Sequence, residues 1–143
     1  TSWHVIAPLN LRALHMACDP IIGTHDFSAF CRRPKQDLEP DLEGPETNES
    51  EIREVSLKRY VMQAAWRNKG DGIFAFDIRA NAFCHQMCRS LVGTCVEIGV
   101  GKRRSSDMMT LIRSGDRAEA SQLAPPQGLC LVEVGYPDAV ITL

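Results

Sequence analysis

Apolar residues recur at helical spacing in three stretches of the chain. The first covers residues 11–18, where Asn10 is placed to cap the helix, and the second covers residues 83–98. The third begins at residue 106 or 107 and ends at Gly115, a residue type that commonly closes helices. This pattern predicts three helices, of which the one at 83–98 is the longest.

Two other stretches alternate between apolar and polar residues, as half-buried strands do. The first covers residues 55–66, and its even-numbered residues from 60 to 66 would share one face. The sequence NKGDG then predicts a turn, and residues 73–80 predict the second arm of an antiparallel hairpin. A last strand is expected at 129–136. The order of these elements predicts an α/β fold of the α+β kind, with an antiparallel sheet and helices packed on one face.

Charge is distributed unevenly along the chain. Residues 37–54 hold eight acidic residues and one basic residue, so this segment carries −7 while the remaining chain carries +5. Its prolines and low apolar content predict an exposed, flexible acidic loop at about residues 34–52. The basic remainder is compatible with nucleic-acid binding, although a charge of this size is a weak argument by itself.

Length and composition predict one soluble domain. A chain of 143 residues can bury a core without disulfides, so its six cysteines are expected to be reduced. No apolar run is long enough for a membrane span, and the first residues lack the basic and apolar regions of a signal peptide. These features predict a cytoplasmic protein.

The ten residues NAFCHQMCRS, at 81–90, allow three interpretations. A zinc site needs four converging ligands, but Cys84, Cys88 and Cys95 share the apolar face of the predicted helix, and His85 points about 100° away from Cys84. A redox pair needs exposed thiols in an electropositive setting. Buried cysteines that pack as small apolar side chains are therefore favoured over a metal site or a redox pair.

The other face of the same predicted helix is polar. His85, Gln86, Arg89 and Gly93 follow one another at steps of one, three and four residues and form one stripe. Gly93 costs about 1 kcal/mol of helix stability relative to Ala, which makes sense if another chain segment or a ligand comes close there. The pattern alone favours a solvated Arg89 on the outer face of an amphipathic helix.

The sequence GTHDFSAF, at 23–30, also has two interpretations. His25 and Asp26 could form an acid–base pair. More often such an Asp caps a turn by accepting from backbone amides, while aromatic residues such as Phe27 and Phe30 anchor the segment. The structural interpretation is favoured because no nucleophile lies at a fixed offset from the pair.

Taken together, four motifs resemble the C-terminal half of the bacterial TruA-type tRNA pseudouridine synthases. They are GTHDFSAF, a strand that contains Arg59, FDIRANAFCHQMCRSLVG at 76–93 and GLCLVEVGYP at 128–137, in this order. The resemblance covers nearly the whole chain except the acidic loop. It implies the pseudouridine synthase fold, in which an antiparallel sheet is shared between two halves of the enzyme.

The resemblance also implies a reaction. The family isomerises uridine to pseudouridine at positions 38–40 of the tRNA anticodon stem-loop, acts as a homodimer and needs no metal or redox cofactor. Its catalytic Asp lies in a GRTD motif of the N-terminal half, and this motif is absent here. We therefore expect the chain to be the C-terminal half of a longer enzyme and to be inactive alone. The alternatives are a non-catalytic RNA-binding module and a metal-binding or regulatory domain.

Particular residues acquire roles from the resemblance. Arg89 matches the arginine that pairs with the catalytic Asp across the cleft, so in this chain alone it would be solvated or unpaired. Leu129 matches the apolar wall under the target base, and His25 in the first motif is a candidate substrate contact. The candidate phosphate contacts are Arg59, Lys102, Arg103 and Arg104, of which only Arg59 falls within a family motif. The implied partners are tRNA and the N-terminal half.

Overall fold

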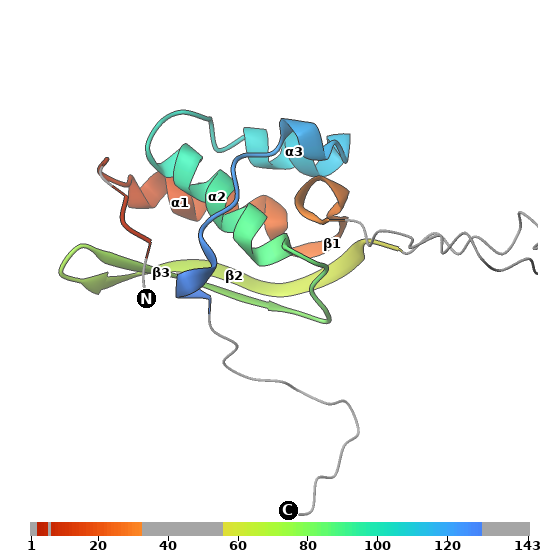
Figure 1. Ribbon diagram of the computed structural model, residues 1–143, viewed down its shortest axis with the longest axis horizontal. Helices are drawn as coiled ribbons and strands as arrows, with labels where there is room; N and C mark the ends of the chain where they lie inside the picture. The colour runs from red at the N-terminus through yellow and green to blue at the C-terminus, as the bar shows by residue number, and fades with distance from the viewer. Residues whose placement is uncertain (1–2, 6, 33–55, 130–143) are drawn as a thin grey trace, which may run out of the picture.

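The computed structural model describes residues 3–5, 7–32 and 56–129. These residues form an antiparallel three-stranded sheet in the order β1-β2-β3, and the helices cover one face of it (Figure 1). The predicted mixed α/β fold is therefore confirmed. The acidic loop and the predicted last strand beyond Leu129 lie outside the described residues.

The elements are α1 (Leu11–Cys18), β1 (Gly23–Asp26), β2 (Lys58–Gly70), β3 (Ile73–Ala80), α2 (Met87–Gly99) and α3 (Asp107–Ser114), with short 3-10 turns η1 (Asp19–Ile21), η2 (Ser28–Phe30), η4 (Arg117–Glu119) and η5 (Pro126–Gly128).

The predicted hairpin is formed by β2 and β3. The two residues between the strands, Asp71 and Gly72, both have positive φ angles, of 54° and 73°. Two successive positive φ angles belong to the tight turn whose twist suits a hairpin, and Asp-Gly is a preferred sequence for it. The turn follows Gly70, so β2 extends four residues beyond the predicted end at Trp66.

The register of β2 shifts between Val61 and Gln63 at the pairing with β3. Because of this irregularity the buried residues of the strand are Val61, Ala64 and Trp66, while Tyr60 and Met62 are exposed. The prediction that the even-numbered residues from 60 to 66 share one face was therefore wrong. A bulge adds a residue to one strand and reverses the alternation beyond it.

The core lies between the sheet and the helices. From α2 it receives Met87, Leu91, Cys95 and Ile98, all buried. α1 packs beside α2 at Gly99, where an added Cβ would come within 2.9 Å of a Leu14 methyl carbon. The predicted caps hold α1 and α3: Asn10 accepts a hydrogen bond from the Ala13 amide at 3.3 Å, and Gly115 closes α3 with a φ of 62°. These expectations from sequence are confirmed.

The start of α2 differs from the prediction. The helix begins at Met87 and not at Phe83, because Gln86 has a φ angle of 65°. A positive φ in a non-glycine residue breaks helical geometry at that point. Cys84 and His85 therefore precede the helix, and the predicted polar stripe is reduced to Arg89 and Gly93.

None of the helices in the described ranges is long and apolar enough to cross a membrane.

Candidate functional site

Arg89 lies in the first turn of α2 and is bound twice to Ala124. Its side-chain Nε donates to the Ala124 carbonyl at 2.7 Å, and the Ala124 amide donates to the Arg89 carbonyl at 3.1 Å. The Arg89 side chain is half-buried. Within residues 3–32 and 56–129, as far as the structure describes them, it forms no ion pair. Its Nε is therefore held by the backbone, and its pairing with a catalytic Asp stays a prediction.

Residues 121–124, here called the crossing segment, run across α2 on their way from η4 to η5 (Figure 1). The segment passes directly over Gly93, where an added Cβ would overlap the Gln122 carbonyl oxygen. The same Cβ would lie 3.2 Å from the Gln122 carbonyl carbon. The prediction that Gly93 admits a neighbouring chain segment is confirmed, and the neighbour is this segment.

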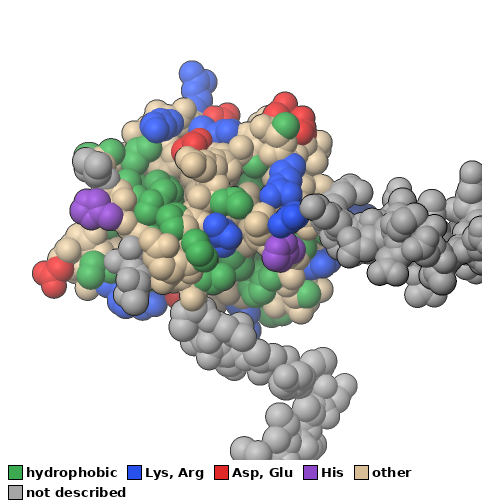
Figure 2. Space-filling view, viewed as in Figure 1, with side chains coloured by type: hydrophobic (Ala, Val, Ile, Leu, Met, Phe, Trp, Pro, Cys, Tyr) green, Lys and Arg blue, Asp and Glu red, His purple; other side chains and the backbone are tan. Residues whose placement is uncertain are grey.

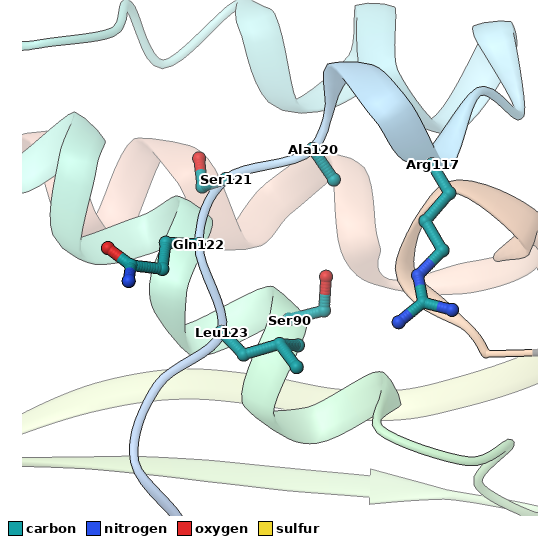
Figure 3. Close-up of a pocket in the computed structure, with 6 residues that line it drawn as sticks. All are labelled: Ser90, Arg117, Ala120, Ser121, Gln122 and Leu123. Carbon is teal, nitrogen blue, oxygen red and sulfur yellow. The ribbon is translucent and has the colours of Figure 1, made fainter.

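A cavity of about 450 Å³ lies between α2, η4 and the crossing segment (Figure 3). Ser90 on α2, Arg117 on η4 and the crossing-segment residues 121–123 line it, together with Ala120. Arg117 donates from Nη2 to the side-chain oxygen of Gln86 at 2.7 Å, which ties η4 to the start of α2. The cavity therefore adjoins the turn of the helix that carries Arg89.

His25 and Arg59 come from different motifs and are brought together by the sheet. They are directly opposed across β1 and β2. Arg59 donates from Nη1 to the carbonyls of Ser56 and Lys58, at 2.9 and 2.8 Å, and its Nε is buried without a hydrogen-bond partner. His25 Nε2 lies 2.9 Å from the Ile22 carbonyl. His25 and Arg59, both predicted contact residues, are thus half-buried, and each is hydrogen-bonded to a nearby backbone carbonyl.

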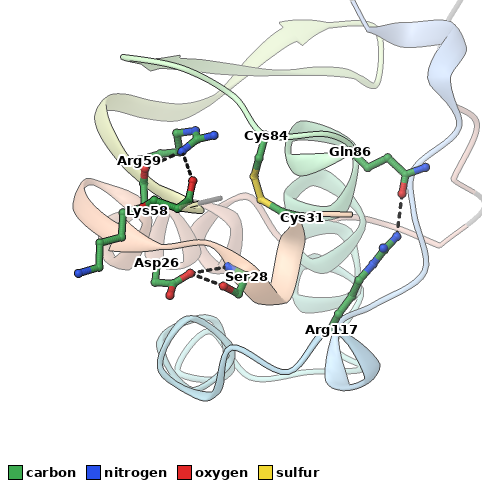
Figure 4. The surroundings of a disulfide bond; sticks show 9 residues. Asp26, Ser28, Cys31, Lys58, Arg59, Cys84, Gln86 and Arg117 are labelled. Carbon is green, nitrogen blue, oxygen red and sulfur yellow. Dashed lines mark hydrogen bonds between the residues drawn. A yellow bond between two sulfur atoms is a disulfide. The ribbon is translucent and has the colours of Figure 1, made fainter. Parts of the chain in front are cut away.

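Asp26 forms a turn and not an acid–base pair with His25. It accepts hydrogen bonds from the Ser28 amide, at 3.0 Å, and from the Ser28 hydroxyl (Figure 4). Phe27 and Phe30 are buried beside this turn. Neighbouring residues of a strand point to opposite faces, which separates the His25 and Asp26 side chains. The structural interpretation of GTHDFSAF is confirmed.

Cys31 and Cys84 form a disulfide that joins η2 to the segment before α2 (Figure 4). Their Cα atoms are 5.7 Å apart, within the usual range for this bond. The Arg32 amide donates to the His85 carbonyl at 2.8 Å beside it. The prediction that all six cysteines are reduced, with Cys84 on a buried helical face, was therefore wrong for this pair. The pair is separated by 53 residues, and only the folded structure shows that they meet.

The remaining cysteines in the described ranges are free thiols that behave as core residues. Cys18 and Cys95 are buried and Cys88 is half-buried. Burial raises the pKa of Cys18 and of Cys88 to about 11 and that of Cys95 to about 12. Such thiols are protonated at neutral pH and are poor nucleophiles and metal ligands. No group of three His, Cys, Asp or Glu side chains converges in the part of the chain that the structure describes.

The basic loop at 102–104 follows the last turn of α2, at the end opposite Arg89. Lys102 and Arg104 are exposed. Arg103 instead donates from Nε to Glu97 at 2.8 Å and from Nη2 to the Glu119 carbonyl at 2.6 Å. On the face shown in Figure 2, Lys and Arg side chains stand in several separate groups. The loop and Arg89 are therefore not brought together into one site.

Leu129 directly follows η5, and its side chain is 62% exposed. Leu129 lies five residues beyond Ala124, the last residue of the crossing segment. An exposed leucine is available for contact with a planar apolar group, as the role under a base requires. The role of Leu129 under a base stays a prediction.

Sequence reasoning missed Gln122, which approaches Gly93, and Ala124, which binds Arg89. Both act through backbone atoms, which every residue type has. Arg117 and Gln86 were also missed as a bonded pair, since 31 residues separate them. The one signal in the sequence was Gly93 itself, a helix-weakening residue in the middle of a helix.

Comparison with known proteins agrees with this architecture. Residues 17–137 match the family model described as tRNA pseudouridine synthase. The chain therefore belongs to the tRNA pseudouridine synthase family. Among curated proteins it is similar to those named tRNA pseudouridine synthase A. It is 35% identical over 96% of its length to the protein of Leifsonia xyli and 36% identical over 96% to that of Myxococcus xanthus. It is 34% identical over 94% of its length to a Thermoanaerobacter protein of the same name.

The chain spans only part of these relatives. It covers 41% of the Leifsonia protein, 46% of the Myxococcus protein and 48% of the Thermoanaerobacter protein. The matched region is thus less than half of each relative.

Proposed function

We propose that this chain is the C-terminal half of an enzyme that isomerises uridine to pseudouridine in the anticodon stem-loop of tRNA. The observation that carries the proposal is Arg89, a half-buried guanidinium fixed through Nε, with no ion pair in the described part of the chain. Burying a charge is costly unless an opposite charge meets it. A partner outside the described residues accounts for an arginine held in this way, and family membership gives the reaction.

In this proposal the N-terminal half supplies the catalytic Asp, and Arg89 keeps it ionised. A fixed positive charge near a carboxylate lowers the pKa of that carboxylate and favours its charged form. The reaction breaks the bond between N1 and the sugar, re-forms it at C5, and moves one proton from C5 to N1. It is an isomerisation, so no electron acceptor is required. The Asp attacks, and Arg89 maintains the protonation state in which it can do so.

In the same proposal, a few exposed or half-buried residues of the chain contact the RNA. Leu129 would lie under the target base once the base has left its stack. Arg59, Lys102 and Arg104 would contact phosphates, and His25 would contact the substrate beside Arg59. Such contacts position the RNA without reading its sequence. The family resemblance also leads us to propose a homodimer located in the cytoplasm.

The test is tritium release from tRNA carrying [5-³H]uridine, since the reaction exchanges the C5 proton with water. The chain joined to an N-terminal half of the kind found in its relatives should release tritium, and the chain alone should not. Turnover by the chain alone would refute the division of the site between two halves. Tight tRNA binding by the joined protein without tritium release would favour the non-catalytic RNA-binding module.

A further inference from the structure

We propose that Gly93 is a positioning residue for Arg89. By leaving room for the crossing segment (residues 121–124) at the surface of α2, it sets the place at which the Arg89 guanidinium stands. The effect of Gly93 on turnover rests on the function proposed above. Its effect on the Arg89 side chain does not.

The approach of the crossing segment to α2 leaves no room for a side chain at position 93. The atoms that an added Cβ would meet are all backbone: it would overlap the Gln122 carbonyl oxygen, and it would lie 3.4 Å from the Ala124 nitrogen. A backbone carbonyl cannot rotate away as a flexible side chain can. Any residue larger than glycine must therefore lift the segment from the helix.

Arg89 and Gly93 are four residues apart, so they lie on the same face of α2, one turn above the other. The crossing segment covers both. At Gly93 its backbone occupies the place of a side chain, and at Arg89 it forms the two hydrogen bonds with Ala124. A segment displaced at Gly93 also displaces the Ala124 carbonyl, only two residues from Gln122, and with it the acceptor of the Arg89 Nε–H.

This carbonyl determines the direction of the guanidinium. Nε is the one side-chain nitrogen of Arg89 with a hydrogen bond in the described ranges. When Nε is fixed, the planar guanidinium presents its two outer nitrogens in one orientation. Small displacements of such a group are expensive in catalysis, and a misplacement of about 1 Å can cost about 100-fold in rate.

The test compares Gly93→Ala with Gly99→Ala. Both changes replace a glycine of α2 by alanine and crowd a neighbour, but the atoms crowded at Gly99 are the ends of leucine side chains, which can move. Gly99 faces the side chains of Leu9 and Leu14 and lies on the order of 15 Å along the helix from Arg89. The first readout is the ¹H–¹⁵N resonance of Arg89 Nε in the 143-residue chain, assigned by its disappearance in Arg89→Lys. The second is kcat and KM for tRNA in the joined enzyme.

Gly93→Ala should shift the Arg89 Nε resonance, speed its exchange with water and lower kcat by about 100-fold with KM little changed. Gly99→Ala should leave the resonance and kcat as they are. Should Gly93→Ala fail to fold, Ala124→Pro replaces it. Proline removes the amide that donates to the Arg89 carbonyl, and it should shift the same resonance.

An unchanged Arg89 resonance in a folded Gly93→Ala variant would overturn the proposal, as would a shifted resonance with unchanged kcat. Failure of the proposed function looks different. The unmutated joined enzyme would then be inactive, while the resonance would still shift in Gly93→Ala and stay in place in Gly99→Ala.

Discussion

Arg103 donates a hydrogen bond from Nε to the Glu97 carboxylate at 2.8 Å, and this ion pair turns the middle residue of the basic loop towards α2. Its neighbours Lys102 and Arg104 remain exposed on either side. Three adjacent cations therefore divide into one that supports the fold and two that are exposed, as the proposed phosphate contacts require.

This division predicts different effects for three substitutions to alanine. Removing Lys102 or Arg104 should weaken tRNA binding and reduce the salt dependence of the binding constant by about one unit of slope for each phosphate that is no longer neutralised. Arg103→Ala should instead lower the thermal midpoint and leave the slope unchanged. Binding titrations of the joined enzyme at several salt concentrations measure the slope. A slope that falls as much for Arg103→Ala as for Arg104→Ala would contradict the division.

Glu97 should make the stability of the chain depend on pH. Burial raises the pKa of Glu97, but hydrogen bonds from Ser121 and Arg103 outweigh this effect and hold the pKa below its ordinary value. A carboxyl group with a lowered pKa in the folded state adds stability above its ordinary pKa of about 4.3, and loses it as the pH falls through the folded value. Glu97→Gln should therefore lower the thermal midpoint at pH 7 and have less effect in acid.

Glu119→Gln is the matched control, because the Glu119 side chain is exposed and has no hydrogen bond within the described ranges. Its thermal midpoint should follow that of the unmutated chain at every pH. An equal loss for Glu97→Gln at pH 7 and at pH 3 would show that packing, and not charge, explains the effect.

The disulfide should contribute strongly to stability. A crosslink that closes a loop of 53 residues reduces the entropy of the unfolded chain, and the chain-entropy relation gives about 4 kcal/mol for this length. Cys31→Ser and Cys84→Ser should each lower the free energy of unfolding by up to this amount, and a reductant should do the same to the unmutated chain. Denaturation with and without reductant measures the difference.

Cys88→Ser is the control for the loss of a sulfur atom, since Cys88 is half-buried and has a free thiol. Its stability should be as sensitive to reductant as that of the unmutated chain. If Cys84→Ser is as stable as the unmutated chain under oxidising conditions, the crosslink does not contribute to the fold.

Local signals in the sequence were sufficient for much of this fold. Asn10 before an apolar pattern and Gly115 after one set the ends of α1 and α3, because caps act through neighbouring residues. The Asp-Gly pair set the turn between β2 and β3 for the same reason. Strand β1 was not predicted, since GTHD has no apolar alternation and becomes a strand only by pairing with β2.

The errors arose where local backbone geometry or contacts distant in sequence departed from the apolar pattern. Apolar spacing continues from Phe83 into α2, but Gln86 has a positive φ and the helix begins only at Met87, after the bridged Cys84. Arg89 could be selected from sequence through its family motif. Its acceptor could not, because Ala124 binds it with a backbone carbonyl, which every residue type possesses.

Arg89→Ala should have different consequences in the chain alone and in the joined enzyme. In the chain alone it removes the hydrogen bond from Nε to the Ala124 carbonyl. A hydrogen bond from a charged donor contributes about 1.5–3 kcal/mol when buried, and Arg89 is half-buried, so we expect a loss on the order of 1 kcal/mol. A fully solvated Arg89, which the sequence pattern favours, would instead leave the stability almost unchanged.

If the proposed function holds, the same substitution in the joined enzyme leaves the catalytic Asp without its opposing charge. The pKa of that Asp should rise, and turnover should fall by far more than tRNA affinity does. Arg113→Ala is the control in both proteins, because Arg113 is exposed on α3 and should change stability by less than about 0.5 kcal/mol. Two denaturation curves and one kinetic assay make the comparison. If Arg89→Ala costs the chain several kcal/mol while the joined enzyme keeps its rate, Arg89 supports the crossing segment alone and its assignment to the active site is wrong.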